Sequence, residues 1–388
     1  CRGSVLYHHG LKFPEIPNPY KGRIPTFMWT EAIRRGCEFT KDKERVRNLQ
    51  QLDSNIKFIF NLAGNTLINQ HSDVNATKEL LEDETKVEFI VASDIFMTPS
   101  VRYADLVLPG VSMFEEEFIA EPWNEGNYLI YGNKCMEPLF ECRSDFDWMK
   151  ELAIRMGLAD FSEGCNTQEE WLELIYNRLR KKEAELPCFA ELKKQGVYKY
   201  KKNTSFVAFK ECIEDFEHHK FPTESGKIEI FAKNLLKFND SENIPPIPKF
   251  VPTPEGYTDS LREQYPLQLL GWHSKRRTHS VHDNNELLEK VEPQRLWINP
   301  QDANARGISD ESLVKVYNGH GSVLVRARVS DRIMQGVVCL PQGAWYTPDA
   351  EGVDLRGSVN VLTHSIPTAW GKCNGQHTAL VEVELYKV

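Results

Sequence analysis

The stretch IKFIFNLAGN, residues 56–65, is an apolar run that ends in a loop of glycine and asparagine. A second apolar run, VEFIVAS at residues 87–93, is followed directly by Asp94. The segment ATKELLEDE lies between them and predicts a helix, and TPSVRYADLVLPG after them predicts another helix and a third strand. Strands that alternate with helices in this way predict a parallel sheet with helices on both faces.

The sequence that follows this region is first helical and then mixed. Residues 145–195 carry apolar side chains at three- and four-residue spacing, which predicts amphipathic helices. The segment FPTESGKIEIF at residues 221–231 predicts a turn and a strand. Residues 243–256 hold five of the 21 prolines, which favours a stiff, extended linker.

The C-terminal part has the pattern of a β-rich domain. After about residue 263, short apolar segments are separated by Gly, Asn and Asp turns: YPLQLLGW, QRLWIN, SLVKVYN, GSVLVRARVS and GVVCL. One short helix, PQDANARG, lies among them. Short strands in this arrangement predict a barrel. We therefore expect an α/β domain at 1–245, incomplete at its N-terminus, a Pro-rich linker at 246–262 and a β-barrel domain at 263–388.

Charge, hydropathy and cysteine spacing exclude several classes of protein. The 47 basic and 56 acidic residues give a net charge of −9, which argues against a general nucleic-acid binder. The mean hydropathy is −0.47, and no apolar stretch approaches the ~18 residues of a spanning helix, so we expect no direct membrane insertion. The nine cysteines are scattered without a C-x-x-C pair, which argues against a local zinc or iron–sulfur site. The chain opens CRGSVLYHHG without an initiator Met or an apolar leader, and we expect it to be part of a longer protein.

A cationic loop is the first candidate binding site. Three consecutive cations stand beside histidines and hydroxyls in GWHSKRRTHS, and a helical segment follows them. Such a group suits a phosphate or pyrophosphate, although a solvated loop without a specific partner is the alternative. The candidate residues are Gly271, Trp272, His273, Ser274, Lys275, Arg276, Arg277, Thr278, His279 and Ser280.

Polar residues that follow the predicted strands form the second candidate site, because ligands of parallel sheets bind at the carboxyl ends of the strands. These residues are Asn65, Ser93, Asp94 and Asp145. A carboxylate can accept two parallel hydrogen bonds from the N1–H and amino group of guanine. An Asp after a strand is also a common helix cap, and this alternative applies to Asp94 in particular.

The third candidate is the C-terminal run PQGAWYTPDAEG and GSVNVLTHSIPTAWGKCNGQHT, which is rich in Gly, Asn, Thr and aromatic residues. Loops of this composition can line a polar heterocycle, but they can also be ordinary barrel turns. Common catalytic and nucleotide-binding motifs, GxGxxG after a strand, the P-loop, HExxH and GxSxG, do not occur in the sequence.

In this order, the segments resemble the dimethyl sulfoxide reductase family of molybdopterin oxidoreductases, and most closely its anaerobic dimethyl sulfoxide reductases. The resemblance spans nearly the whole chain. It rests on IPTFMWTEAIRRG, AGNTLINQHSDVN, YADLVLPG, TQEEWL, PTESGKIEIF, YPLQLLGWHSKRRTHS, WINPQDANARGI, GAWYTPDAEGVD and VNVLT.

The resemblance implies a bis(molybdopterin guanine dinucleotide) cofactor with molybdenum, held between α/β domains and a C-terminal double-psi barrel. Asn65, Ser93, Asp94 and Asp145 would contact one guanosine end, and residues 271–280 would hold pterin and phosphate. Asn360 and His377 would be late contacts from the barrel. Glu116 falls where some relatives carry a Lys, so the resemblance does not extend to that contact.

The resemblance also places some chemistry outside this chain. The family carries its iron–sulfur cysteines and its molybdenum ligand in an N-terminal half, so we expect no catalytic residue and no metal ligand here. An iron–sulfur cluster is expected only in that half, and this chain alone is expected to be inactive.

The implied activity of the whole protein is reduction of an S-oxide or N-oxide, such as dimethyl sulfoxide, by oxygen-atom transfer in anaerobic respiration. The implied partners are an iron–sulfur electron-transfer subunit and a membrane anchor subunit, at the periplasmic or outer face of the cytoplasmic membrane. One alternative is a related molybdenum enzyme that acts on nitrate, polysulfide, selenate or formate. The other is a non-catalytic binding module.

Overall fold

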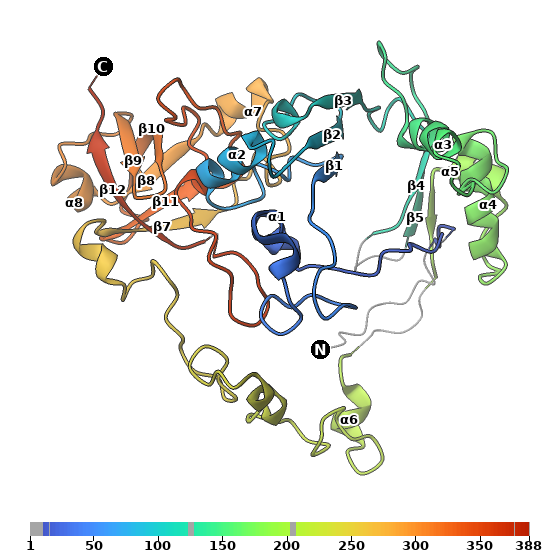
Figure 1. The fold of residues 1–388 in the computed structure, drawn as a ribbon, viewed down its shortest axis with the longest axis horizontal. Coiled ribbons are helices and arrows are strands. Elements are labelled where there is room, and N and C mark those ends of the chain that lie inside the picture. Colours follow the sequence, from blue (N-terminus) through green and yellow to red (C-terminus); the bar gives the residue numbers. More distant parts are fainter. Residues whose placement is uncertain (1–10, 15, 123–127, 202–206, 376, 388) are drawn as a thin grey trace. The chain divides into compact units, whose positions relative to one another are not determined.

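The computed structural model describes residues 11–14, 16–122, 128–201, 207–375 and 377–387. The chain divides into two compact units (Figure 1). One consists of Leu108–Lys233 and the residues before Tyr20, and the other, which we call the barrel unit, of Tyr20–Val107 and Asn234–Val388. The predicted ranges 1–245, 246–262 and 263–388 divide the sequence differently, and they stay a prediction about sequence domains.

The parallel sheet expected from the first apolar runs is present. Strands β1 (Phe58–Leu62), β2 (Phe89–Asp94) and β3 (Leu106–Pro109) lie in the order β1-β2-β3. β1 and β2 run parallel with Phe58 opposite Phe89 and Leu62 opposite Ser93, so both strands end at the same edge. Helix α2 (Val74–Glu82) connects them and begins at Asp73, whose side chain accepts a hydrogen bond from the Ala76 amide. This local cap satisfies one of the backbone N–H groups that a helix start leaves open.

One face of this sheet departs from the expectation of helices on both sides. Phe58 and Phe60 lie two residues apart on one face of β1, and their ring centroids are 6.2 Å apart, as are those of Phe58 and Phe89. Phe58 is 54% exposed, Phe60 37% and Phe89 42%. This face is therefore partly open to solvent, and Trp29 and Ile33 of the α-helix that precedes β1 in the sequence line a pocket beside Phe58 and Phe60.

The C-terminal part folds into a closed six-stranded barrel, which confirms the predicted architecture. Around the barrel the strands follow the order β10-β8-β11-β7-β12-β9. They are β7 (Leu267–Trp272), β8 (Arg295–Ile298), β9 (Leu313–Tyr317), β10 (Ser322–Val329), β11 (Val337–Pro341) and β12 (Ala379–Leu385). The pairs β7–β11 and β8–β10 are parallel. The sequence pattern did not predict β12, which closes the barrel between β7 and β9.

The barrel and the parallel sheet share one hydrophobic core. Val314 and Val316 of β9 are fully buried, and the same cluster includes Ile68, Leu80 and Ile90 from the region of the sheet. Each such side chain contributes about 1.5–3 kcal/mol by leaving water. This shared core ties the loop after β1 to the barrel. The remaining helices of the unit are short: α1 (Trp29–Arg35), α7 (Glu286–Val291) and α8 (Pro300–Asn304).

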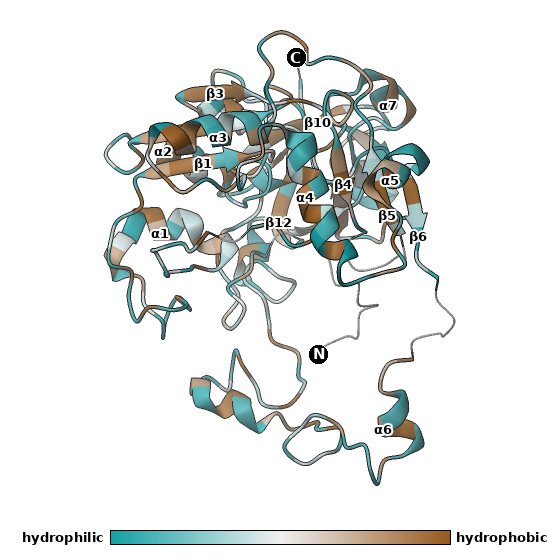
Figure 2. Ribbon diagram, turned by 90° about the vertical axis from the view of Figure 1, so that its right-hand side faces the viewer, coloured by the Kyte–Doolittle hydropathy of each residue, from teal (hydrophilic) through white to brown (hydrophobic). Residues whose placement is uncertain are grey.

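The other unit combines an antiparallel sheet with the helices predicted for residues 145–195. Its strands are β4 (Phe118–Ala120), β5 (Tyr128–Gly132) and β6 (Val197–Lys199), and its helices are α3 (Asp145–Arg155), α4 (Gln168–Arg180), α5 (Phe189–Gln195) and α6 (Lys210–Glu214). Thr167 and Glu170 form a capping box at the start of α4. The apolar stripe of α4, with Leu172 and Tyr176, packs in a core with Leu129 of β5 (Figure 2).

The strand predicted within residues 221–231 is not formed. Ile228 and Ile230 have the alternation of a strand but are 76% and 75% exposed, and the segment has no pairing partner among the described residues. Alternation alone does not make a strand, because the ladder also needs a neighbour to hydrogen-bond. In the described part of the chain, no helix combines the length and the apolar character needed to span a bilayer.

Candidate functional site

A cavity of about 380 Å³ lies in the barrel unit, and polar side chains dominate its wall. Asn65, His273, His279, Ser280, Asn360 and His377, all proposed from the sequence as ligand-binding residues, line it together. The wall also contains Gln342 and Gly343 from the third candidate run, PQGAWYTPDAEG. Four further residues of the wall were not proposed from the sequence: Phe27, Thr66, Asn69 and Gln70. We call this space the polar cavity.

Strand direction explains why distant segments meet at the polar cavity. β7 and β11 are parallel, and Trp272 at the end of β7 lies opposite Pro341 at the end of β11. The loops that follow these strands therefore begin side by side, and they carry His273 and Gln342 into the wall. The parallel strand ends explain why Gln342 and Gly343, at the start of the candidate run PQGAWYTPDAEG, lie at the cavity.

Asn65 offers a hydrogen-bond donor to the polar cavity. Its Oδ1 accepts from the hydroxyl of Ser100 at 2.8 Å and from the Ser100 amide at 3.1 Å, which fixes the orientation of the side chain. Its Nδ2 is buried and has no hydrogen-bond partner in the described part of the chain. Because a buried donor without an acceptor is costly, this amide suits a ligand oxygen or nitrogen acceptor.

Two further asparagines join the loop after β1 to loops of the barrel. The Asn69 side-chain amide donates to the Ala344 carbonyl at 2.6 Å. The Asn360 amide in turn donates to the Asn69 carbonyl at 2.6 Å. This bond uses one of the two N–H donors of the Asn360 amide. The side chain therefore holds the wall together and still has one N–H and its oxygen to offer a ligand.

His273, His279 and Gln342 form one polar group in the wall. The Gln342 Nε2 lies 3.0 Å from His279 Nδ1 and 3.1 Å from His273 Nδ1, and the two rings are 5.3 Å apart. The backbone N–H of Gln342 donates to the Trp272 carbonyl at 2.9 Å, which anchors the loop to the end of β7. Imidazole and amide groups can act as donors or acceptors, so this group suits the edge of a polar heterocycle.

Gly343 allows two loops of the polar cavity to approach each other closely. Its φ is +93°, and a Cβ at this position would lie 1.7 Å from the carbonyl oxygen of His279. The opposing residue His279 also has a positive φ of 52°. No side chain fits between these backbones, so glycine is required here.

Arg276 and Arg277, predicted to bind phosphate, do not line the polar cavity. Both side chains are 1% exposed and form ion pairs with Asp283, at 3.0 Å and 2.5 Å. Burial lowers the pKa of Arg277 to about 10 against the attraction of Asp283. The interpretation of these two guanidinium groups as a direct phosphate clamp is therefore not supported, because an internal carboxylate already occupies them.

The remaining proposed residues of the cationic loop also lie outside the wall of the polar cavity. Trp272 packs against Trp297 with ring centroids 5.1 Å apart, and the buried Ser274 hydroxyl donates to Glu292 at 3.3 Å. Gly271 lies within β7, whereas Lys275 and Thr278 are exposed to solvent. None of these residues lines the polar cavity.

Asp94 is the last residue of β2, at the carboxyl edge of the parallel sheet where it was expected. Its Oδ1 accepts from the Ile95 amide at 2.7 Å, and burial raises the pKa of its carboxyl group. The following helical turn begins only at Val101, so the alternative interpretation of Asp94 as a helix cap is wrong. Ser93 is buried beside it, and its carbonyl accepts from the Ala63 amide at 2.7 Å, which joins β2 to the loop after β1.

Asp145 belongs to the other unit, where it is the first residue of α3. Its Oδ1 accepts from the indole of Trp148 at 3.0 Å. The N-cap of this helix is the preceding Ser144, whose hydroxyl accepts from the Asp147 amide. Asp145 therefore has a structural contact within its own helix, and its predicted role toward guanine stays a prediction.

A buried histidine supports the loop that carries His377. His364 is 2% exposed, and burial lowers the pKa of its ring, which favours the neutral form. Its Nδ1 accepts from the Ile366 amide at 3.1 Å. A Cβ at Gly375 would lie 2.6 Å from this ring, so the loop just before His377 lies directly against it.

The donor set fits an organic ligand better than a metal ion. The wall offers amide and imidazole groups, and no group of three or more His, Cys, Asp or Glu in the described residues is arranged to hold a metal. A polar heterocycle with several acceptors and donors would match the unpaired Asn65 amide and the His273–Gln342–His279 group.

Two protein-family models match the chain. The model for the molydopterin dinucleotide binding domain matches residues 267–379, which contain most of the barrel. The model for molybdopterin oxidoreductase matches residues 33–155, which contain the parallel sheet.

Curated relatives match almost the whole chain. It is 42% identical to dimethyl sulfoxide reductase DmsA of Escherichia coli and 40% identical to that of Haemophilus influenzae, over 96% of this chain and 47% and 48% of theirs. It is 33% identical to the dimethyl sulfoxide/trimethylamine N-oxide reductase of Cereibacter sphaeroides, over 84% of this chain and 41% of that protein. The chain thus spans about half the length of these relatives.

A solved structure has a similar fold. Acetylene hydratase from Pelobacter acetylenicus superposes with a TM-score of 0.68 at 20% identity, over 93% of this chain and 46% of that one.

Proposed function

Since this chain belongs to the dimethyl sulfoxide reductase family of molybdopterin oxidoreductases, we propose that it forms part of the binding site for a bis(molybdopterin guanine dinucleotide) cofactor with molybdenum. The observation that carries this proposal is the polar cavity, where Asn65, His273 and Asn360 meet from three distant segments. When bound, the cofactor supplies the redox chemistry, and the residues of this chain bind and orient it.

Each group in the wall has a proposed task that follows from its hydrogen bonds. Asn65 donates its unpaired Nδ2 to an acceptor of the ligand. The His273–Gln342–His279 group binds the edge of a pterin-type heterocycle, and Ser280 and His377 complete the wall. Arg276 and Arg277 act on the ligand only through the loop that they hold in place. We also propose that the closed barrel has the double-psi topology of the family.

Guanine recognition is assigned to the carboxyl edge of the parallel sheet. Asp94 presents a carboxylate there, next to the buried Ser93, and a carboxylate is acceptor-only, as the N1–H and amino donors of guanine require. Asp145 is proposed as a further guanosine contact on the basis of the family resemblance alone. The role of Asp94 rests also on its position at the strand end.

The whole protein is proposed to reduce an S-oxide or N-oxide by oxygen-atom transfer. This proposal is supported by the relatives whose names give dimethyl sulfoxide and trimethylamine N-oxide as substrates. An iron–sulfur cluster and the molybdenum ligand would come from sequence outside this chain, so the chain alone would be inactive. An iron–sulfur subunit and a membrane anchor subunit are the proposed partners, at the outer face of the cytoplasmic membrane.

Analysis of bound metal and nucleotide tests the proposal. The complete protein, purified without oxygen, is expected to contain molybdenum and to release about two guanine nucleotides for each molybdenum on acid hydrolysis, because each of the two pterins carries one. Reduction of dimethyl sulfoxide and of trimethylamine N-oxide by a reduced dye would then define the substrate. A folded protein without molybdenum and without guanine nucleotide would contradict the proposal and favour a non-catalytic binding module.

Asp94→Asn is expected to weaken binding of the guanine dinucleotide by about 1–3 kcal/mol, because an amide leaves one guanine donor unmatched. Asn still accepts the hydrogen bond from the Ile95 amide, so the local turn should survive. The measurement is the ratio of guanine nucleotide to purified complete protein.

Asp83→Asn is the matched control for this prediction. Asp83 also accepts from a nearby backbone amide, that of Thr85 at 3.0 Å, but it follows α2 and does not lie at the edge of the sheet. If the Asp94 and Asp83 variants retain equal amounts of guanine nucleotide, Asp94 has no role in guanine recognition.

A further inference from the structure

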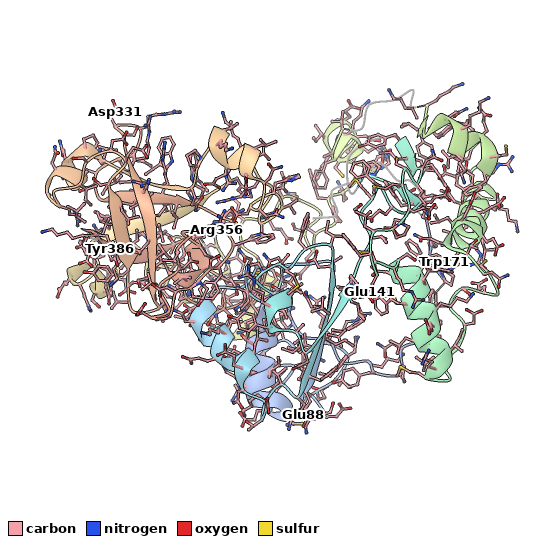
Figure 3. All side chains as sticks on the ribbon, turned by 90° about the horizontal axis from the view of Figure 1, so that it is seen from above. Glu88, Glu141, Trp171, Asp331, Arg356 and Tyr386 are labelled. Atoms are coloured by element: carbon pink, nitrogen blue, oxygen red, sulfur yellow. The ribbon has the colours of Figure 1, made fainter. Side chains whose placement is uncertain are left out.

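Asp283 is a buried carboxylate that accepts hydrogen bonds from several parts of the barrel unit. Its side chain is 0% exposed. Oδ1 accepts from Arg276 Nη2 at 3.0 Å and from Arg277 Nη1 at 2.5 Å. Oδ2 accepts from the Trp345 amide at 2.8 Å and from Arg356 Nε at 3.1 Å. Arg356, which is labelled in Figure 3, is 37% exposed.

The two oxygens of Asp283 hold different segments. Oδ1 binds the cationic loop, in which His273 and His279 lie on either side of Arg276 and Arg277. Oδ2 binds the segment after β11 through the Trp345 amide, two residues beyond Gly343. Both segments line the polar cavity.

Further hydrogen bonds connect the partners of Asp283 to the segments that line the polar cavity. Arg277 donates through Nε to the Gln342 carbonyl at 2.8 Å and through Nη2 to the Pro341 carbonyl at 3.1 Å. The Trp345 indole donates to the Ser280 carbonyl at 2.9 Å. The two segments are therefore cross-linked in both directions, and Asp283 supplies the carboxylate on which the cross-links converge.

Asp283 supplies one of the two negative charges that face the three guanidinium groups of this cluster. Arg276, Arg277 and Arg356 face the carboxylates of Asp283 and Glu289, which leaves one positive charge. Arg276 Nε and Nη1 are buried and have no hydrogen-bond partner in the described residues. Loss of the Asp283 charge would therefore leave more guanidinium groups buried without compensation, and at least one of them would have to move.

We propose that Asp283 is a positioning residue, which aligns the segment 273–280 with the segment 341–346 and thereby sets the spacing of His273, His279 and Gln342 in the polar cavity. Its consequence for the cofactor rests on the function proposed above. The alignment itself is a property of the protein and can be measured without any ligand.

Hydrogen–deuterium exchange of Asp283→Asn tests the alignment. Asn has nearly the same shape but only one oxygen, so it can satisfy the donors on one side and not on the other. We expect amide exchange to become about tenfold faster or more in both segments, 273–280 and 341–346, with unchanged protection in β8, β9 and β10. Asp310→Asn is the control, because Asp310 pairs with Arg328 at 3.1 Å on the surface, with both side chains 45% exposed.

The pattern of exchange separates positioning from general stability. Unchanged exchange in the two segments, or equal acceleration over the whole barrel, would overturn the proposal. Should Asp283→Asn fail to fold, Arg356→Gln removes a half-exposed partner of the same carboxylate, and it should accelerate exchange around Trp345 but not in β9.

Cofactor content of the complete protein supplies the second measurement. We expect Asp283→Asn to lower the ratio of molybdenum to protein at least several-fold relative to Asp310→Asn. If the two segments exchange faster but the variant and the control hold equal molybdenum, positioning by Asp283 stands and the assignment of the cofactor to the polar cavity fails.

Discussion

Gly343→Ala is expected to abolish ligand binding at the polar cavity and to destabilise the protein by about 2–5 kcal/mol. The added Cβ would lie 1.7 Å from the His279 carbonyl oxygen and 2.4 Å from its carbon, far inside contact distance. Backbone atoms cannot rotate away as a flexible side chain does, so one of the two loops must move. Because His279 lies in the opposing loop and Gln342 precedes Gly343, that movement separates the group that would bind the ligand.

Gly352→Ala separates the steric effect from the cost of the backbone conformation. Gly352 has a φ of +83°, close to that of Gly343, but a Cβ there meets nothing within 4 Å. This control should lose only about 1–2 kcal/mol, which is the cost of a side chain in the left-handed region, and should bind ligand normally. Urea denaturation and guanine nucleotide content measure both effects. Equal stability and equal ligand content in the two variants would show that the close approach of the loops is unimportant.

The parts of the fold that could be predicted are those that depend on local sequence patterns, such as apolar runs bounded by turn residues. The runs around Phe58 and Phe89 are apolar and bounded by turn residues, and they form the parallel pair that such runs predict. The segment with Ile228 and Ile230 has an equally clear alternation but no partner strand. Pairing is a tertiary property, and the sequence of one strand does not contain it.

The same distinction applies to the candidate site: local position could be predicted, whereas tertiary partners could not. Asn65 and His273 could be identified because each follows a predicted strand, and they line one cavity. The pairing of Arg276 and Arg277 with Asp283 could not, because three adjacent cations look alike in sequence whether they face a ligand or an internal carboxylate. Only the burial of Arg276, Arg277 and Asp283 separates those two interpretations.

Arg277→Ala is expected to destabilise the protein by about 3–5 kcal/mol, since it removes a buried guanidinium that bonds Asp283 and several buried oxygen acceptors. The variant also loses the donors to the Pro341 and Gln342 carbonyls and to Gln294 Oε1 at 2.6 Å. Burial lowers the pKa of Arg277 by more than the attraction of Asp283 raises it. The cost of the substitution therefore comes from the acceptors left unpaired and not from loss of a strong net attraction.

Arg328→Ala is the matched control, because it removes a guanidinium from a surface pair with Asp310 in the same barrel. Exposed pairs contribute about 0–1 kcal/mol, so this variant should denature at nearly the wild-type urea concentration. The comparison also decides between the two interpretations of the cationic loop. A direct phosphate clamp predicts that Arg277→Ala loses ligand but unfolds like the control, since a solvated cation has little to contribute to folding. A structural ion pair predicts that the midpoint of unfolding falls first, in protein without any ligand, and that loss of binding follows from the misplaced Gln342.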